Sequence, residues 1–184
     1  MTELALHILD IANNSTRAKA KNVAISVVAD TAADTLTITV SDDGCGMDKE
    51  LLERVTDPFS TTRTTRKVGL GIPLFKQAAL LTGGSFSIES EPGKGTVTKA
   101  VFGLRHIDRV PLGNLGSTMT ALAGGFPDTD FTLLYEWDGK KYEFSTVKLK
   151  EVLDGVPLSE PEVLNYIEDM IDENIENING GQPI

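Results

Sequence analysis

The segment from Thr35 to Met47, Thr-Leu-Thr-Ile-Thr-Val-Ser-Asp-Asp-Gly-Cys-Gly-Met, decides how this chain is interpreted. Its first half alternates apolar residues with Thr and Ser, which predicts a strand with one buried face. Asp42 ends that strand, and Gly44 and Gly46 follow. Glycines let the backbone turn sharply and come close to a flat or bulky neighbour. A carboxylate at a strand end can accept a hydrogen bond from an amine. The segment alone fits an ordinary Asp-Gly turn as well as a binding site.

The residues around this segment predict an alternation of helices and strands. Apolar residues recur at helical spacing from Leu4 to about Ala18. The other expected elements up to Leu104 are strands over 23–28 and 35–40, a short helix over 48–55, a polar cationic loop over 57–69, a buried helix over 70–82 ended by Gly83-Gly84, and strands over 85–90 and 96–104.

A second run of elements is expected after His106. Residues 111–123 predict a helix that ends at Gly124-Gly125. Strands over 131–137 and 141–146 flank Asp138-Gly139, which is a strong hairpin signal. Residues 161–178 predict an acidic amphipathic helix. Its apolar stripe consists of Val163, Leu164, Ile167, Ile171 and Ile175.

The pattern Asp42-x-Gly44-x-Gly46, followed by Met47, resembles the first nucleotide-binding box of the GHKL family, also called histidine kinase-like or Bergerat-fold ATPases. In that family the aspartate accepts a hydrogen bond from the adenine amino group. The resemblance implies that these four residues bind the nucleotide.

The first expected helix carries a second family feature. Asp10 and Asn14 are four residues apart in His-Ile-Leu-Asp-Ile-Ala-Asn-Asn-Ser, which places both side chains on one helix face. In the family the asparagine ligates Mg²⁺, and the residue at the Asp10 position is usually Glu, the general base, or in kinases Asn or His. We therefore expect Asn14 to be the metal ligand and Asp10 a shorter catalytic base. Without the resemblance, the Asn13-Asn14 pair fits an ordinary polar face.

Further features occur in the family's order. Arg17 lies where kinases often have a Lys or Arg that contacts phosphate, although a solvated surface arginine fits equally. Asp57-Pro-Phe-Ser-Thr-Thr-Arg63 resembles the opening of the kinase ATP lid. Gly69-Leu70-Gly71 resembles the second glycine box, at a helix start that favours phosphate. The lid and second-box residues that the resemblance assigns to the nucleotide are Phe59, Thr61, Thr62, Arg63, Lys67, Gly69, Leu70 and Gly71.

The last feature is Glu91-Pro-Gly-Lys-Gly-Thr96, which resembles the turn that closes the kinase pocket. Gly93 and Gly95 occupy the glycine positions, and Thr96 stands where it can hydrogen-bond near adenine. The resemblance spans residues 3–104 and implies an α/β two-layer sandwich, with a mixed, mostly antiparallel sheet covered on one face by helices. It also implies ATP and Mg²⁺ as ligands.

The resemblance leaves three functions open. The first is a kinase-like phosphotransfer module that acts on a separate protein, as anti-sigma-factor serine kinases do. The second is an ATPase switch of the gyrase or MutL kind, and the third is a nucleotide-binding regulatory or assembly subunit without turnover. The lid and closing-turn sequences favour the kinase branch. We expect an ATP-binding domain over residues 1–106 and an acidic extension (helix, hairpin, helix) over 107–184.

Charge and composition limit the kinds of partner that we expect for this protein. The net charge is -10, and residues 111–184 hold 14 acidic against 4 basic side chains, whereas residues 1–110 hold 13 of each. An acidic protein gains nothing from counterion release, so we expect no nucleic acid and, instead, a protein partner that is basic. No apolar run is long enough to span a membrane and the first residues do not resemble a signal peptide, so we expect a cytoplasmic protein.

Two residues resemble catalytic residues but lack the neighbours that catalysis requires. His106-Ile-Asp-Arg-Val-Pro-Leu112 echoes the phosphoacceptor segment of histidine kinases, but Ile107 replaces the usual acid and no helical hairpin surrounds it. We therefore expect no phosphorylation at His106. Cys45, the single cysteine, lies among aspartates, which disfavour a reactive thiolate. His7 is expected to be structural.

Overall fold

The computed structural model describes residues 2–56, 70–182 and 184. The elements in chain order are α1 (Leu4–Arg17), β1 (Asn22–Asp30), β2 (Thr35–Asp42), α2 (Lys49–Thr56), α3 (Gly71–Leu81), β3 (Ser85–Glu91), β4 (Gly95–Gly103), α4 (Leu115–Gly125), β5 (Asp130–Trp137), β6 (Lys140–Ser145), α5 (Thr146–Leu153) and α6 (Pro161–Asn179).

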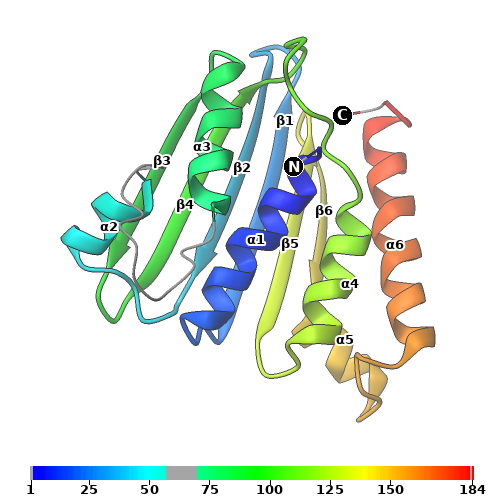
Figure 1. Ribbon diagram of the computed structural model, residues 1–184. Helices are drawn as coiled ribbons and strands as arrows, with labels where there is room; N and C mark the ends of the chain where they lie inside the picture. Colours follow the sequence, from blue (N-terminus) through cyan, green and yellow to red (C-terminus); the bar gives the residue numbers. More distant parts are fainter. Residues whose placement is uncertain (1, 57–69, 183) are drawn as a thin grey trace.

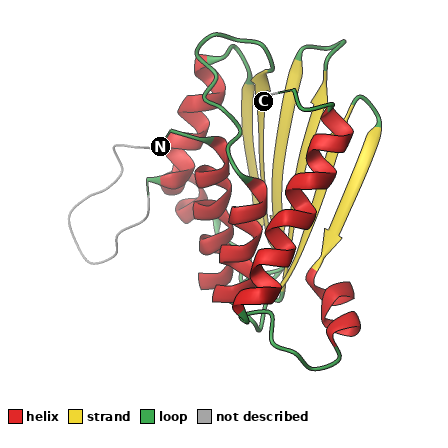
Figure 2. Ribbon diagram, turned by 90° about the vertical axis from the view of Figure 1, so that its right-hand side faces the viewer, coloured by secondary structure: helices red, strands yellow, loops and turns green. Residues whose placement is uncertain are grey.

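The strands form one six-stranded sheet in the order β3-β4-β2-β1-β5-β6. Only the β1–β5 pair is parallel, and the other four pairs are antiparallel. Helices α1, α3, α4 and α6 lie on one face of this sheet, and α5 sits at its end (Figures 1 and 2). The predicted mixed sheet with helices on one face is therefore confirmed.

Alternation along the strands explains the two layers. In β2, Leu36, Ile38 and Val40 are buried, while the intervening Thr and Ser side chains are only half-buried. β1 and β5 alternate in the same way. Successive strand residues point to opposite faces, so each strand contributes one apolar row to the helix side. Burying these rows against the helices supplies the main favourable free energy of folding.

The C-terminal elements share the sheet and the core with the rest of the chain. β5 lies beside β1, with Ile25 opposite Leu133. α4 packs between α1 and α6, and the predicted α6 stripe faces inward, with Val163, Ile167 and Ile171 buried. The backbone nitrogens of Leu4 and Ala5 donate to the carbonyls at 111 and 112, at 2.9 and 2.7 Å. β1, at the centre of the sheet, therefore depends on residues from both halves of the chain.

Two elements differ from the sequence-based expectation. α4 begins at Leu115 rather than at 111, because Gly113 adopts φ 81° and Asn114 caps the helix by accepting from the Ser117 N–H at 2.6 Å. The helix also runs through both glycines that were expected to end it. α5 was not predicted, and Ser145 caps its start.

None of the helices in the described part of the chain combines the length and apolar character needed to cross a membrane.

Candidate functional site

The turn after β2 packs directly against other backbone segments. A Cβ on Gly46, which has φ 65°, would lie 2.0 Å from the Glu91 carbonyl oxygen. A Cβ on Gly95, with φ 104°, would lie 1.9 Å from the Asp42 carbonyl oxygen. Gly44 is less tightly confined, with Ala18 2.9 Å from a virtual Cβ. These glycines therefore let the turn pack against the end of α1 and against the β3–β4 turn.

Asp42 presents a carboxylate held from two sides. Its Oδ1 accepts the Gly44 backbone N–H at 2.9 Å, and its Oδ2 accepts the Ser15 hydroxyl of α1 at 2.6 Å. Each carboxylate oxygen has two lone pairs. Counting the donors in the described part of the chain, each oxygen of Asp42 therefore keeps one lone pair for a further donor. The side chain is half-buried at the end of β2. It is therefore an oriented acceptor where the turn meets α1.

The neighbouring Asp43 has a different set of contacts. Its carboxylate accepts the backbone N–H groups of Lys21 and Asn22 at 2.7 and 2.8 Å and the Asn22 amide at 2.8 Å. Bonds from Asn22, first from its side chain and then from its backbone, lower the pKa of Asp43 below its ordinary value. Asp43 therefore joins the turn to the start of β1.

A serine on β3 connects the turn to Thr96. Ser90 Oγ accepts the Met47 backbone N–H at 2.8 Å, lies 2.9 Å from the Gly95 carbonyl oxygen and lies 2.9 Å from Thr96 Oγ1. Thr96 is also the register partner of Asp42 across β2 and β4. The structure thus brings Asp42, Met47 and Thr96 together at one end of strands β2 and β4.

α1 contributes a row of polar side chains to the same region. Asp10 is exposed and Asn14 is half-buried, and neither side chain has a hydrogen-bond partner among residues 2–56, 70–182 and 184. Amide and carboxylate oxygens of this kind are hard donors that suit Mg²⁺. Arg17 is exposed in the last turn of α1 and makes no ion pair within that same part of the chain.

The start of α3 lies against Asp10. A Cβ on Gly71 would lie 3.1 Å from Asp10 Cβ and 3.2 Å from Asp10 Oδ2. Gly71 and Ile72 are the first residues of α3, and both are buried. The first N–H groups of a helix have no acceptor within the helix, and together with the helix dipole they attract anions. The structure therefore places the carboxylate of the expected base beside an anion-attracting helix start.

His7 lies one turn before Asp10 and is only 3% exposed. Its ring centroid is 5.5 Å from that of Phe75. Burial is the largest cause that lowers the pKa of His7, so the ring is neutral near pH 7. The expectation that His7 is structural agrees with this packing.

Part of the sequence-based site lies outside the described residues. Phe59, Thr61, Thr62, Arg63, Lys67 and Gly69 fall in the segment 57–69, so their contacts are not described. Leu70, which follows them, is 57% exposed at the start of α3.

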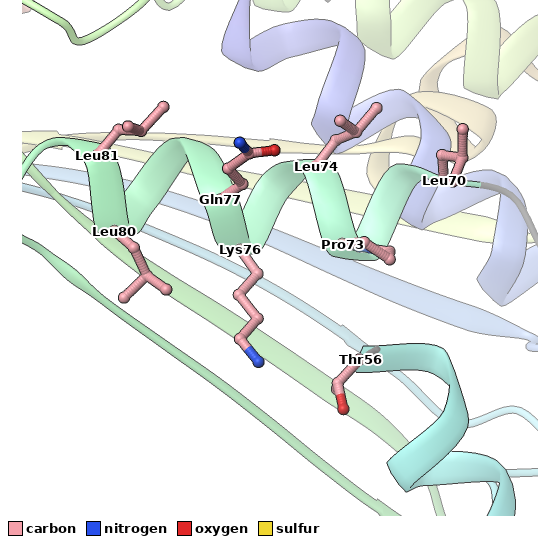
Figure 3. Close-up of a pocket in the computed structure, with 8 residues that line it drawn as sticks. All are labelled: Thr56, Leu70, Pro73, Leu74, Lys76, Gln77, Leu80 and Leu81. Carbon is pink, nitrogen blue, oxygen red and sulfur yellow. The ribbon is translucent and has the colours of Figure 1, made fainter. Parts of the chain in front are cut away.

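A separate apolar groove of about 530 Å³ runs along the outer side of α3. Figure 3 shows Leu70, Leu74 and Leu81 along the helix, with Thr56 of α2 across the gap and Lys76 reaching into it. Of the candidate nucleotide residues that the structure describes, only Leu70 lines this groove. It is distinct from the polar site at Asp42.

Of the two residues that resemble catalytic groups, His106 lies apart from this site, whereas Cys45 lies within the Asp42 turn. His106 follows β4 in a turn, where its Nδ1 accepts the Asp108 N–H at 3.2 Å. It lies at the opposite end of β4 from Thr96, and no helical hairpin carries it. Cys45 is exposed, and its N–H donates to the Ala18 carbonyl at 2.9 Å.

Sequence reasoning missed three residues that hold the site together: Ser15, Asp43 and Ser90. All three act through contacts with segments far along the chain, 22 to 43 residues away. No local pattern signals such contacts. The one available hint was that Ser15 directly follows Asn14 in the second family feature.

Comparison with known proteins gives an independent result. Residues 2–106 match the family described as histidine kinase-, DNA gyrase B-, and HSP90-like ATPase. The chain is 33% identical over 98 residues to the non-motile and phage-resistance protein of Caulobacter vibrioides, covering 50% of this chain and 12% of that protein. It is 32% identical over 97 residues to sporulation kinase C of Bacillus subtilis, covering 53% of this chain and 22% of that protein. The chain thus corresponds to less than a quarter of either relative.

Solved structures support the fold beyond the matched segment. The ATPase domain of Aquifex aeolicus MutL, complexed with ADP, aligns with a TM-score of 0.52 at 15% identity, covering 84% of this chain and 70% of that one. The N-terminal domain of a DNA repair protein aligns with a TM-score of 0.55 at 16% identity, covering 79% of this chain and 53% of that one. The family match, which covers more than half of the chain, is decisive: this protein belongs to the histidine kinase-, DNA gyrase B- and HSP90-like ATPases and is an ATP-binding domain related to histidine kinases.

Proposed function

We propose that this protein is a Mg²⁺-dependent, kinase-like module that binds ATP at the Asp42 turn and transfers a phosphoryl group to a separate protein. The observation that carries this proposal is the half-buried Asp42 carboxylate, oriented by the Gly44 N–H and by Ser15 of α1, the helix that also carries Asp10 and Asn14. Asp42 accepts the adenine amino group through a lone pair that these donors leave open. Gly44, Gly46 and Met47 form the surrounding turn, and Thr96 lines the same edge.

The phosphate end of the site lies toward α3. There the first N–H groups of Gly71 and Ile72 attract anionic oxygens, and α1 contributes Asn14, whose amide has no hydrogen-bond partner among the described residues. Asn14 is the metal-holding residue, and a bound Mg²⁺ would neutralise phosphate charge during transfer. From the sequence, Arg17, Arg63 and Lys67 add positive charge for the phosphates, with Phe59, Thr61, Thr62, Gly69 and Leu70 as further lid and second-box residues.

Asp10 is proposed as the base that orients the attacking group. Its carboxylate lies beside Gly71, where an anion at the helix start would be within reach of it. Aspartate is shorter than the glutamate common at this position, so direct proton removal is less effective and slow turnover is expected. Catalysis then rests mainly on positioning and charge neutralisation.

The kinase assignment is supported by the relatives. The matching region of sporulation kinase C belongs to a protein named as a kinase, and the sensor protein kinase FleS of Pseudomonas aeruginosa is 35% identical over 97 residues. The two alternatives are an ATPase switch and a regulatory subunit without turnover. They differ from the kinase in where the γ-phosphate ends up.

One assay separates these three functions. Purified protein is incubated with γ-labelled ATP, Mg²⁺ and fractions of a source-cell extract, and labelled protein, free phosphate and ADP are measured. Label on a protein in the extract, lost in Asn14→Ala and reduced in Asp10→Ala, supports the kinase. Free phosphate without labelled protein indicates an ATPase switch, and binding without ADP formation indicates a regulatory subunit. Either of the last two results rejects phosphotransfer.

The proposal also gives residues 107–184 a partner-binding function. The exposed side of α6 carries four acids along one stripe: Glu162, Asp169, Glu173 and Glu176. Such a surface raises the association rate of a basic protein, so complex formation should weaken with salt. The alternative is a solvated face that keeps the protein soluble.

This extension cannot be tested by truncation, because β5 pairs with the central strand β1. Instead, the four acids are changed together to Gln or Asn in the full chain. Proteins captured from a low-salt extract are then compared with those captured by the wild type. The matched control changes Glu89 and Glu143, exposed acids of β3 and β6, to Gln. Equal capture by all three proteins would reject the docking function.

A further inference from the structure

Ser15 makes the shorter of the two hydrogen bonds to Asp42, whose carboxylate is the proposed acceptor for adenine. Its hydroxyl lies 2.6 Å from Asp42 Oδ2, and the residue is only 3% exposed in the last turns of α1. The same hydroxyl lies 3.3 Å from the Ile11 carbonyl. A hydroxyl has one proton, and the shorter bond to a charged acceptor is the stronger of the two.

This bond has two consequences for Asp42. Together with the Gly44 N–H on Oδ1, it ties both carboxylate oxygens and so fixes the rotation of the carboxylate plane. It also engages a lone pair of the second oxygen, and the lone pairs that stay open on the carboxylate can accept a hydrogen bond from a ligand but donate none. A purine with an amino group at position 6 satisfies those acceptors, whereas a 6-oxo purine directs its own oxygen at them.

We propose that Ser15 is a positioning residue that sets the selectivity of the site for 6-aminopurine over 6-oxopurine nucleotides. The inference rests on the proposed ATP site at Asp42 and assigns to it a determinant outside both glycine boxes. Without the Ser15 hydroxyl, Oδ2 loses its protein partner and the carboxylate is free to turn away from the base. The amino group of adenine then loses its fixed acceptor, and binding of a 6-oxopurine nucleotide is disfavoured less strongly.

The experiment compares ATP with ITP, because these nucleotides differ in the group at position 6 and in the proton at N1. Affinities are measured by calorimetry for the wild type, Ser15→Ala and Ser15→Thr. Thr16→Ala is the matched control, since its hydroxyl donates to the Asn13 carbonyl at 2.9 Å and does not touch Asp42. Exchange of the Gly44 amide proton is measured by NMR in the same four proteins without nucleotide.

Loss of one charge-assisted hydrogen bond predicts that Ser15→Ala lowers ATP affinity about tenfold and lowers the ATP-to-ITP preference about tenfold. Ser15→Thr should retain most of the preference, and Thr16→Ala should retain all of it. Gly44 amide exchange should be several-fold faster in Ser15→Ala and unchanged in Thr16→Ala, because a mobile carboxylate no longer protects that proton.

The outcomes distinguish the selectivity role of Ser15 from the ATP site at Asp42 itself. If Ser15→Ala weakens both nucleotides equally, or leaves Gly44 exchange at the wild-type rate, Ser15 does not set selectivity and the inference is wrong. If wild-type protein binds neither nucleotide, the ATP site itself is rejected, and base selectivity with it, even where faster Gly44 exchange confirms that Ser15 holds Asp42.

Discussion

Two Asp-Gly turns close strands at opposite ends of the same sheet, and they have very different surroundings. The turn at Asp138-Gly139 joins β5 to β6 with φ angles of 48° and 85°, as a two-residue hairpin requires. A Cβ on Gly139 would meet nothing within 4 Å. The turn from Asp42 to Gly46 is confined by α1 on one side and by the β3–β4 turn on the other.

The aspartates differ in the same way. Asp138 is exposed, and its carboxylate accepts the Thr31 N–H at 2.8 Å and the Thr31 hydroxyl at 2.7 Å. Asp42 is half-buried and accepts from the α1 residue Ser15. The comparison teaches that a short motif acquires function through what the fold packs around it. The Asp138 turn contacts one neighbouring segment, at Thr31, and leaves Gly139 open, whereas the Asp42 turn packs against both α1 and the β3–β4 turn.

The largest contrast is expected for alanine at the second glycine of each turn. Gly46→Ala needs a positive φ and moves its Cβ into the Glu91 carbonyl, so it should lower the free energy of unfolding by about 3 kcal/mol or more and abolish ATP binding. Gly139→Ala meets only the cost of positive φ, about 1–2 kcal/mol. Urea denaturation measures both values. Similar losses in the two variants would show that the Asp42 turn is not confined.

A smaller contrast is expected inside the β3–β4 turn. Gly93 has φ 78° with nothing within 4 Å of a virtual Cβ, whereas Gly95 contacts the Asp42 carbonyl. Gly95→Ala should therefore destabilise the protein by about 2 kcal/mol more than Gly93→Ala, and only Gly95→Ala should impair ATP binding. Thermal unfolding and calorimetry check this pair. An intact site in Gly95→Ala would contradict the close packing of Gly95 against Asp42.

Next in size is the loss of Asp43, which ties the Asp42 turn to β1. Asp43→Ala removes three accepted hydrogen bonds at an exposed position, so the expected loss of stability, after solvent screening, is about 1 kcal/mol. Chemical denaturation provides the value. An unchanged stability would mean that the turn keeps its place without this carboxylate.

The smallest effect is a dependence of stability on pH. Hydrogen bonds from Asn22 lower the pKa of Asp43, and those from Thr31 lower the pKa of Asp138. A lowered pKa means that the stabilisation is complete above the ordinary Asp pKa of about 3.9 and is lost as the pH falls through the lower folded-state pKa. Asp43→Asn and Asp138→Asn should each flatten the fall in stability below about pH 4. An acid profile identical to that of wild type in both variants would refute this.

The sequence predicts those elements whose contacts are local, and it does not predict contacts between distant segments. Periodicity and caps predict α1, β2, the Asp138-Gly139 hairpin and the buried stripe of α6, because those signals are local. The start of α4 was missed because Pro111 and Leu112 pair with α1 instead of entering the helix. The parallel pairing of β1 with β5 joins residues over 100 positions apart, which no local pattern encodes.

The candidate site shows the same division. The resemblance singled out Asp42, Asn14 and Gly71 as site residues, and the structure places Asp42 against α1, the helix that carries Asn14, and Gly71 against Asp10. It could not show that Gly44 and Gly46 face protein backbone, or that Ser15 orients Asp42. Those facts arise from the packing of α1 against the turn.

The most direct test of the account is a calorimetric titration with ATP and Mg²⁺ that compares wild type, Asp42→Asn and Asp138→Asn. In Asp42→Asn an amide replaces the charged acceptor, which should lower the affinity about tenfold to a hundredfold while the protein stays folded. Asp138→Asn changes the same residue type at the other turn and should bind ATP as the wild type does. Wild-type affinity in a folded Asp42→Asn variant would contradict the assignment of ATP to the Asp42 turn.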